Sequence, residues 1–245
     1  MSVLELVDIG HAYGQQPVLE HLSLSIAGGE MVALVGPSGC GKTTLAHIAA
    51  GILQPSQGWV RRAYRRHGMI FQEPRLLPWA SAKVNIGFPL QLAGMSRREA
   101  NHHAERIAAT VALQPEHLSQ LPDALSGGMR QRVAIARALV ADPDLLLCDE
   151  PFTALDVTLR RRMQDVLLEA IQARRFSSLF ITHDLSEAVR MAQRIAVMDQ
   201  SGQGILGERC PPGRIGQRSA AEIFEFVQYC LHDDPLFSAA GMGGS

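Results

Sequence analysis

The segment Gly36-Pro37-Ser38-Gly39-Cys40-Gly41-Lys42-Thr43-Thr44 decides the fold, because it fits the pattern G-x-x-x-x-G-K-[ST]. The continuous apolar run Met31–Val35 precedes it and predicts a buried strand, while Lys42–Ala50 predicts a helix that ends at Gly51. Between strand and helix, glycines let the backbone curl so that its N–H groups point inward around phosphate oxygens. The helix N-terminus adds a partial positive charge. The segment therefore predicts a phosphate-binding loop (P-loop).

Two side chains of this loop have further chemistry. Lys42 supplies a positive charge for the β- and γ-phosphates of a nucleotide, and the Thr43 hydroxyl is placed to bind Mg²⁺. We predict that all nine residues from Gly36 to Thr44 contact the nucleotide. The alternative is a chance glycine-rich turn, which the flanking strand and helix make improbable.

A second element pairs a buried strand with two acids. The apolar residues 145–148 predict the strand, and Asp149 and Glu150 follow directly. Next to phosphates, Asp149 would hold Mg²⁺ through water, and Glu150 would polarise the attacking water as a general base. The alternative is an ordinary strand that ends in exposed acids.

Composition narrows the class of protein. The chain has 245 residues, with 23 Lys+Arg against 24 Asp+Glu, so its charge does not indicate a nucleic-acid-binding protein. A hydrophobic content of 47% excludes a disordered chain. The four cysteines are scattered without ligand spacing, which suits a reducing cytosol. No secretory leader and no apolar run of the ~18 residues needed to span a bilayer are expected, so membrane spans would come from another chain.

Short apolar runs alternate with longer helical patterns, which is typical of an α/β protein. Further strands are expected at residues 3–7, 22–26, 69–71, 178–181 and 194–198. Further helices are expected at residues 159–173, 185–192 and 220–231, and another begins at Ser96 with Glu99 at its third position. Residues 73–142 show helix and loop patterns only, which predicts an inserted helical subdomain. The tail 241–245 is expected to be mobile.

The segment Leu125-Ser126-Gly127-Gly128-Met129-Arg130-Gln131-Arg132 lies just before the second element. At this point the chain closely resembles an ABC-transporter ATPase subunit, because LSGG followed by a helix is the signature of that family among P-loop proteins. Met129 replaces the usual Gln, as in some importer ATPases. Ser126 and the amides of Gly127 and Gly128 open a helix, which makes a second anion site.

The resemblance assigns roles to four more positions. Tyr13 resembles the aromatic residue that stacks on adenine, and Gln72 resembles the Q-loop glutamine, which senses Mg²⁺ and the attacking water. Asp156, in Ala154-Leu155-Asp156, resembles the D-loop residue that reaches across a dimer. His183 resembles the switch histidine that contacts the γ-phosphate. Each alone has an ordinary structural interpretation, but their order along the chain favours the family roles. Gln72, Glu150 and His183 are thus the expected catalytic set.

The resemblance also implies an architecture and an assembly. The expected fold is an α/β P-loop NTPase of ABC type, with a mixed-sheet core, an N-terminal antiparallel β-subdomain and an inserted helical subdomain. Residues 1–245 would form one ABC ATPase domain, with its core at 1–72 and 143–206, helical subdomain at 73–142 and C-terminal extension at 207–245. ATP and Mg²⁺ are the implied cofactors. Two chains would form a homodimer around two ATP molecules. Hydrolysis of ATP would then let the two chains separate.

The segment Phe71-Gln72-Glu73-Pro74-Arg75-Leu76-Leu77-Pro78-Trp79, with LSGGMRQR, resembles the nitrate/sulfonate/taurine importer group. The implied function is ATP hydrolysis that energises a separate permease for a small oxyanion or organosulfur solute such as nitrate, sulfonate or taurine. A solute-binding protein would be an indirect partner, and the chain would lie peripherally on the cytoplasmic face of the inner membrane.

Residues 76–79 are expected to form an exposed apolar knuckle, with Trp79 as an anchor for the permease. The alternative is that Trp79 packs into its own subdomain. At the level of function, the alternatives are another import or export ATPase and a non-transport ABC regulatory ATPase.

Two further clusters have competing interpretations. Four arginines, Arg61, Arg62, Arg65 and Arg66, surround Tyr64. They could form a nucleic-acid patch, but we predict a solvated strand edge or a hairpin adjacent to ATP, and no nucleic-acid partner. His102-His103 could suggest a metal site, but adjacent residues on a helix point in different directions, so surface positions are expected.

Overall fold

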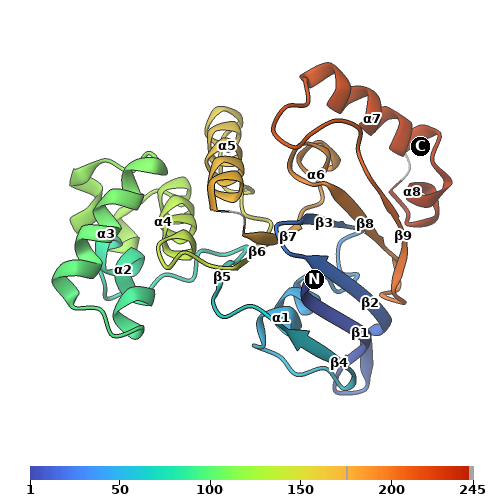
Figure 1. The fold of residues 1–245 in the computed structure, drawn as a ribbon, viewed down its shortest axis with the longest axis horizontal. Helices are drawn as coiled ribbons and strands as arrows, with labels where there is room; N and C mark the ends of the chain where they lie inside the picture. The colour runs from blue at the N-terminus through green and yellow to red at the C-terminus, as the bar shows by residue number, and fades with distance from the viewer. Residues whose placement is uncertain (175, 243–245) are drawn as a thin grey trace. The chain divides into compact units, whose positions relative to one another are not determined.

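The computed structural model describes residues 1–174 and 176–242 of the chain (Figure 1). Within it, two compact units can be separated, Met1–Tyr64 with Arg174–Ser245, and Arg65–Ala173. The first unit contains an antiparallel sheet and a mixed group of strands, and the second contains a parallel pair of strands and the helical segment. The boundaries expected for functional subdomains stay a prediction.

An antiparallel sheet opens the first unit, in the order β2-β1-β4. Its strands are β1 (Ser2–Tyr13), β2 (Gln16–Ala27) and β4 (Gln57–Arg62). The predicted N-terminal antiparallel subdomain is therefore confirmed, but the strands are much longer than the apolar runs at 3–7 and 22–26. Bulges interrupt the register of β1 and β2 between Leu6 and Ile9, and Asp8 there has a positive φ of 53°. These irregularities break the period-two pattern on which the prediction relied.

A mixed sheet forms the centre of this unit, with β7 (Ser177–Ile181), β3 (Met31–Val35) and β8 (Arg194–Met198) parallel to one another. The strand β9 (Ile205–Arg209) runs antiparallel to β8. Every residue of β3 and β7 is buried. The apolar sequence of β3 predicts this, whereas β7 buries Ser177 and Ser178 ahead of its apolar residues 179–181. The helix α1 (Lys42–Ala50) has the predicted bounds, and α6 (Leu185–Met191) is one residue shorter than predicted.

Two helices, α7 (Ala220–His232) and α8 (Pro235–Ala239), end the described chain. Figure 1 shows α7 beside α6, and the two helices are in contact. Asp234 joins the extension to β9, because its buried carboxylate accepts two hydrogen bonds from Arg209, at 2.6 and 2.7 Å. This ion pair lowers the pKa of Asp234. The tail 241–245 was predicted to be mobile, and its residues 243–245 lie outside the described part of the chain.

Two of the four clustered arginines, Arg61 and Arg62, bind other residues of the chain through their side chains. Arg62 donates to the carbonyl oxygens of Ala49, at 3.0 Å, and of Ile48. Tyr64 donates its hydroxyl to the same Ala49 oxygen at 2.8 Å. These side chains therefore satisfy the last carbonyls of α1 and complement the negative end of its dipole. Arg61 pairs with Glu5 across the sheet, as a strand-edge residue would.

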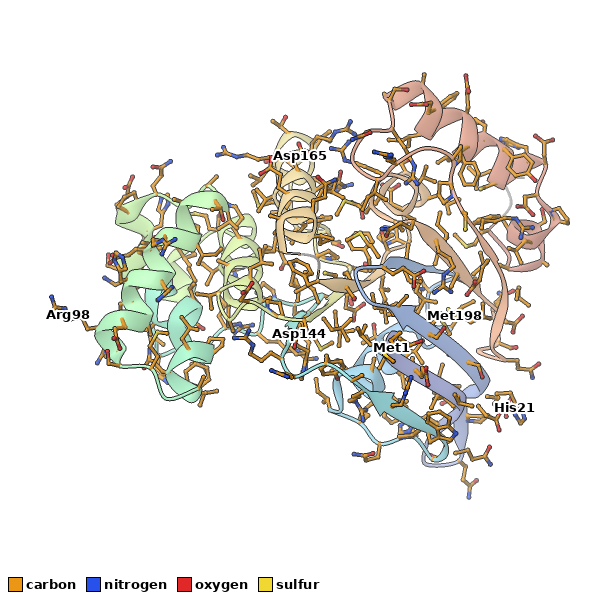
Figure 2. The ribbon with its side chains drawn as sticks, in the orientation of Figure 1. Met1, His21, Arg98, Asp144, Asp165 and Met198 are labelled. Atoms are coloured by element: carbon orange, nitrogen blue, oxygen red, sulfur yellow. The ribbon has the colours of Figure 1, made fainter. Side chains whose placement is uncertain are left out.

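The second unit contains a parallel pair of strands, β5 (His67–Ile70) and β6 (Leu145–Asp149), and the helix α5 (Val157–Arg174). Asp144 holds the entry to β5, since its carboxylate accepts from the backbone N–H groups of Arg65 and Arg66 at 2.8 and 3.0 Å (Figure 2). These bonds lower the pKa of Asp144.

Residues 73–142 of this unit form helices and loops and no strand, as predicted. The helices are α2 (Ala82–Leu92), α3 (Arg97–Thr110), two short 3₁₀ turns at Pro115–Ser119 and Pro122–Ala124, and α4 (Gly127–Leu139). The three α-helices contact one another and form a bundle (Figure 1). The predicted capping box of α3 is present, with Ser96 and Glu99 exchanging hydrogen bonds. His102 and His103 are both exposed on α3.

No helix in residues 1–174 and 176–242 is both long and apolar enough to cross a membrane.

We expect Arg218→Ala to destabilise the first unit, because this buried guanidinium anchors the C-terminal segment to the end of α6. Its partners are five carbonyl oxygens, those of Val189, Ala192, Pro211, Pro212 and Gly213. A hydrogen bond to a charged group contributes about 1.5–3 kcal/mol, and the abandoned carbonyls would stay partly buried. The free energy of unfolding should therefore fall by about 2–4 kcal/mol, measured by thermal unfolding.

Arg214→Ala is the matched control, because Arg214 is exposed in the same segment. An equal loss of stability in both variants would contradict the anchoring role of Arg218.

Candidate functional site

The glycine-rich loop between β3 and α1 has backbone angles that only glycine adopts readily. Gly39 and Gly41 have φ values of 83° and 98°. A Cβ atom at Gly41 would lie 2.6 Å from Leu19 Cδ2 and 3.0 Å from the Val18 carbonyl oxygen. Gly41 is also the N-cap of α1, so among the described residues no side chain caps this helix. The first N–H groups of α1 are therefore available to an anion.

Lys42 lies folded over the loop that it follows. Its ammonium donates to the carbonyl oxygens of Gly36 and Pro37 at 2.8 and 2.7 Å, and the residue is only 7% exposed. The Cys40 sulfur lies 3.8 Å from the same ammonium, and burial raises the pKa of this thiol. Because the thiol stays neutral, Cys40 does not cancel the positive charge that Lys42 brings to the loop. Thr43 is exposed at the second position of α1, while Thr44 is buried.

His183 follows β7 and shares a cavity with the loop. The cavity measures about 570 Å³, and its lining includes Gly36, Pro37 and Ser38, together with residues of α6 and α7. The backbone after β7 is fixed by Thr182, whose hydroxyl donates to the buried Glu187 at 2.8 Å and accepts from the Asp184 N–H at 3.1 Å. The first unit thus brings His183 to the same cavity as the predicted phosphate-binding loop.

Tyr13, at the end of β1, is 55% exposed in the same unit. Its ring lies 5.0 Å from that of His11 in an edge-on arrangement. One face of the tyrosine ring can therefore stack on a flat ligand.

The second unit brings Gln72 and Glu150 together. Ile70 of β5 pairs with Cys148 of the parallel strand β6. Gln72 and Glu150 each come two residues after a member of this pair, so they lie at the same end of the two strands. Gln72 Nε2 donates to Glu150 Oε2 at 3.5 Å, at the long end of the hydrogen-bond range. Asp149 ends β6 and is 2% exposed.

Glu150 occupies a strained position. Its φ of 46° lies in the left-handed region, which is uncommon for a residue other than glycine. Thr153 holds it there, with its hydroxyl 3.2 Å from the Glu150 carbonyl oxygen and 3.3 Å from Oε2. Strain that the surroundings impose on one acid is characteristic of functional sites. The sequence motifs did not indicate Thr153.

The signature segment opens α4. Ser126 is the N-cap, and its Oγ accepts from the Met129 N–H at 3.2 Å. Gly127 and Gly128 form the first turn of the helix. Arg130 fixes the approach to this turn by donating to the Leu125 carbonyl oxygen at 2.8 Å.

Asp156 lies between β6 and α5. Its Oδ1 accepts from the Leu159 N–H at 2.9 Å, which satisfies one free donor at the start of α5. Ala154 and Leu155 precede it, and Leu155 Cδ2 would lie 3.5 Å from a Cβ atom built on Gly128. The predicted site residues thus fall into two groups. Tyr13, residues 36–44 and His183 lie in the first unit, and Gln72, residues 126–128, Asp149, Glu150 and Asp156 lie in the second.

Comparisons with known proteins agree on one family. The family described as ABC transporter matches residues 19–153. The aliphatic sulfonates import ATP-binding protein of Pseudomonas aeruginosa is 43% identical over 236 residues, which are 91% of this chain and 92% of the relative. The taurine import ATP-binding protein of Escherichia coli is 41% identical over 244 residues, 97% and 93% of the two chains.

A solved structure has the same fold. It is the dimeric, post-hydrolysis state of the ATP-binding cassette MJ0796 bound to ADP and Pi, with a TM-score of 0.79 and 28% identity. The similarity covers 86% of this chain and all of that one. The predicted fold class, an α/β P-loop NTPase of ABC type, is thereby confirmed. The predicted mixed sheet and the N-terminal antiparallel sheet are both present.

We expect Lys42→Ala to weaken nucleotide binding about tenfold or more, because a charge-assisted contact with phosphate is lost. Titration with a fluorescent ATP analogue measures the dissociation constant. The control is Lys83→Ala, since Lys83 is the chain's other lysine and pairs with Glu105 on the helical segment. Equal affinity in wild type and Lys42→Ala would contradict the phosphate-binding role of this loop.

Proposed function

The chain belongs to the ABC transporter family, and we propose that it is the ATP-hydrolysing subunit of an importer for a small organosulfur or oxyanion solute. The names of the relatives refer to import of aliphatic sulfonates and of taurine, which supports this solute class. The observation that best supports hydrolysis is the Gln72–Glu150 pair at the ends of β5 and β6.

In this proposal each side chain acts on one part of ATP. Tyr13 stacks on the base, and the N–H groups of residues 36–44 with Lys42 bind the β- and γ-phosphates. Glu150 accepts the proton of the attacking water, which Gln72 helps to orient. His183 contacts the γ-phosphate from the cavity that it shares with the loop.

Mg²⁺ fits the donors that are present. The Thr43 hydroxyl, the Gln72 amide and the Asp149 carboxylate are hard oxygen ligands, which this ion prefers, and it usually keeps several waters as well. Asp149 is 2% exposed at the end of β6, directly before Glu150. When bound, Mg²⁺ would neutralise charge on the phosphates.

The proposed assembly is a homodimer formed on ATP binding, in which Ser126, Gly127 and Gly128 of one copy approach the ATP held by the other. Asp156 would lie at the same interface. The dimeric state of the related cassette supports this arrangement. The dimer would act on a membrane permease supplied with solute by a binding protein, so the chain would lie peripherally on the cytoplasmic face of the inner membrane.

The proposed permease contact is the knuckle formed by residues 76–79. Trp79 is 77% exposed, which disfavours the alternative that it packs into its own subdomain. The knuckle is nevertheless rigid, because the buried Asn85 accepts from the Leu77 N–H at 2.7 Å. Its Nδ2 also donates to three carbonyl oxygens, those of Leu77, Ala80 and Ser81. An exposed, fixed aromatic side chain has the properties of an interface anchor.

Glu150→Gln should retain ATP binding but lose about 100-fold or more of the hydrolysis rate, since an amide cannot accept the proton. Steady-state phosphate release measures the rate. The amide can keep its hydrogen bonds to Gln72 and Thr153, so the fold should not change. Glu116→Gln, exposed on a 3₁₀ turn, is the control. Hydrolysis at the wild-type rate in Glu150→Gln would exclude Glu150 as the general base.

Trp79→Ala should leave the thermal stability and the basal ATPase rate of the free subunit nearly unchanged, because the indole is largely exposed. Association with the membrane permease of this proposal should weaken by about 2 kcal/mol or more, as for an interface hot spot. Co-purification and solute uptake measure the effect, with Leu92→Ala, 73% exposed on α2, as the control. A large loss of stability in the free subunit would instead make Trp79 a core residue.

A further inference from the structure

Arg137, in the last turn of α4, has unusual partners for a partly buried arginine. Its guanidinium donates to the carbonyl oxygens of Pro74 and Arg75, both at 2.8 Å. Burial lowers the pKa of this group. In the described parts of the chain no carboxylate pairs with it. A desolvated charge that binds two successive carbonyls fixes a backbone segment in a defined place.

The segment that Arg137 holds lies directly after Gln72. Arg75 has a positive φ of 43°, so the backbone here is in the left-handed region. The Arg75 guanidinium lies over the Phe71 ring, 4.6 Å from its centroid. Contacts therefore fix the residues before and after Gln72 in the sequence. The Arg75–Phe71 contact is local, whereas the hydrogen bonds from Arg137 come from the helix α4.

The same helix also holds the segment of Glu150. Gln131, which is 1% exposed, donates from Nε2 to the Pro151 carbonyl oxygen at 2.8 Å. Pro151 is the next residue after the strained Glu150. One helix thus anchors the backbone beside both members of the Gln72–Glu150 pair.

We propose that Arg137 and Gln131 are positioning residues, which fix the separation of Gln72 and Glu150 by anchoring their two segments to α4. This rests on the proposed function in so far as the pair is catalytic. Arg137 comes six positions after Gln131, which corresponds to about 9 Å along a helix that rises 1.5 Å per residue. A helix keeps that separation constant, whereas two loops bound to each other would not.

The test uses Arg137→Met and Gln131→Leu, which keep much of the side-chain volume and remove the donors. We expect kcat for ATP hydrolysis to fall about tenfold or more in each, because a small misplacement of catalytic groups is costly. The KM for ATP should stay within about twofold, because the proposed contacts to ATP come mainly from residues 36–44. Since both variants release the same pair, the double variant should lose little more than the worse single variant.

Hydrogen–deuterium exchange provides a second readout that needs no hydrolysis. Arg137→Met should speed exchange in residues 72–76, and Gln131→Leu in residues 150–156. The neighbouring residues 77–85 should keep their rate in both, because Asn85 holds them independently. Arg106→Met, exposed on α3, is the matched control and should change neither readout.

Wild-type exchange in residues 72–76 of Arg137→Met, or a kcat within about twofold of wild type, would overturn the proposal. Arg137→Lys, which keeps one donor group, should give intermediate values, and it decides the question if Arg137→Met does not fold. Wild-type values in a folded Arg137→Lys would also overturn it. If the wild-type chain does not hydrolyse ATP, the proposed function fails, while the exchange measurement still tests the anchoring.

Discussion

The left-handed turn at Gly41 is the constraint on which the proposed phosphate site depends. There is no space for a Cβ atom at this position, and the same residue is the N-cap of α1. A Ser or Asp cap would stabilise the helix by about 1 kcal/mol, but it would occupy the N–H groups that a phosphate needs. The chain therefore has an incompletely satisfied helix start, with Lys42 folded over the loop, and a bound phosphate would supply the missing acceptors.

The helix α4 starts differently, and the difference fits the two roles proposed for these helices. Ser126 already accepts from the Met129 N–H, so part of the hydrogen-bonding capacity of this helix start is satisfied within the chain. An anion that meets α4 gains less than one that meets α1. A nucleotide would therefore be held mainly by the loop at 36–44, and the contact with the signature would form and break more easily.

The sequence predicted the elements whose stability is local and missed those that depend on distant partners. Uniformly apolar β3 and the glycine-bounded α1 were predicted residue for residue, whereas β4 and β9 lack an apolar run and are stabilised by pairing with β1 and β8. The site follows the same division. Motifs indicated Lys42, Glu150 and Ser126 by residue type and spacing. Arg137 acts on carbonyl oxygens 62 and 63 residues away, and no sequence pattern records a bond to a backbone oxygen.

The position of these anchors on α4 has a mechanical consequence. The helix has 13 residues, begins at the signature and contains both anchors within its length. Because its core-facing residues Val133, Ala134 and Ala136 are buried, we expect the helix to move as one body rather than to bend between its ends. A displacement imposed at Ser126 would then reach the Gln72 and Glu150 segments equally. The pair could move with the signature while its own geometry is preserved, which is what a site that must hydrolyse ATP only in an assembled state requires.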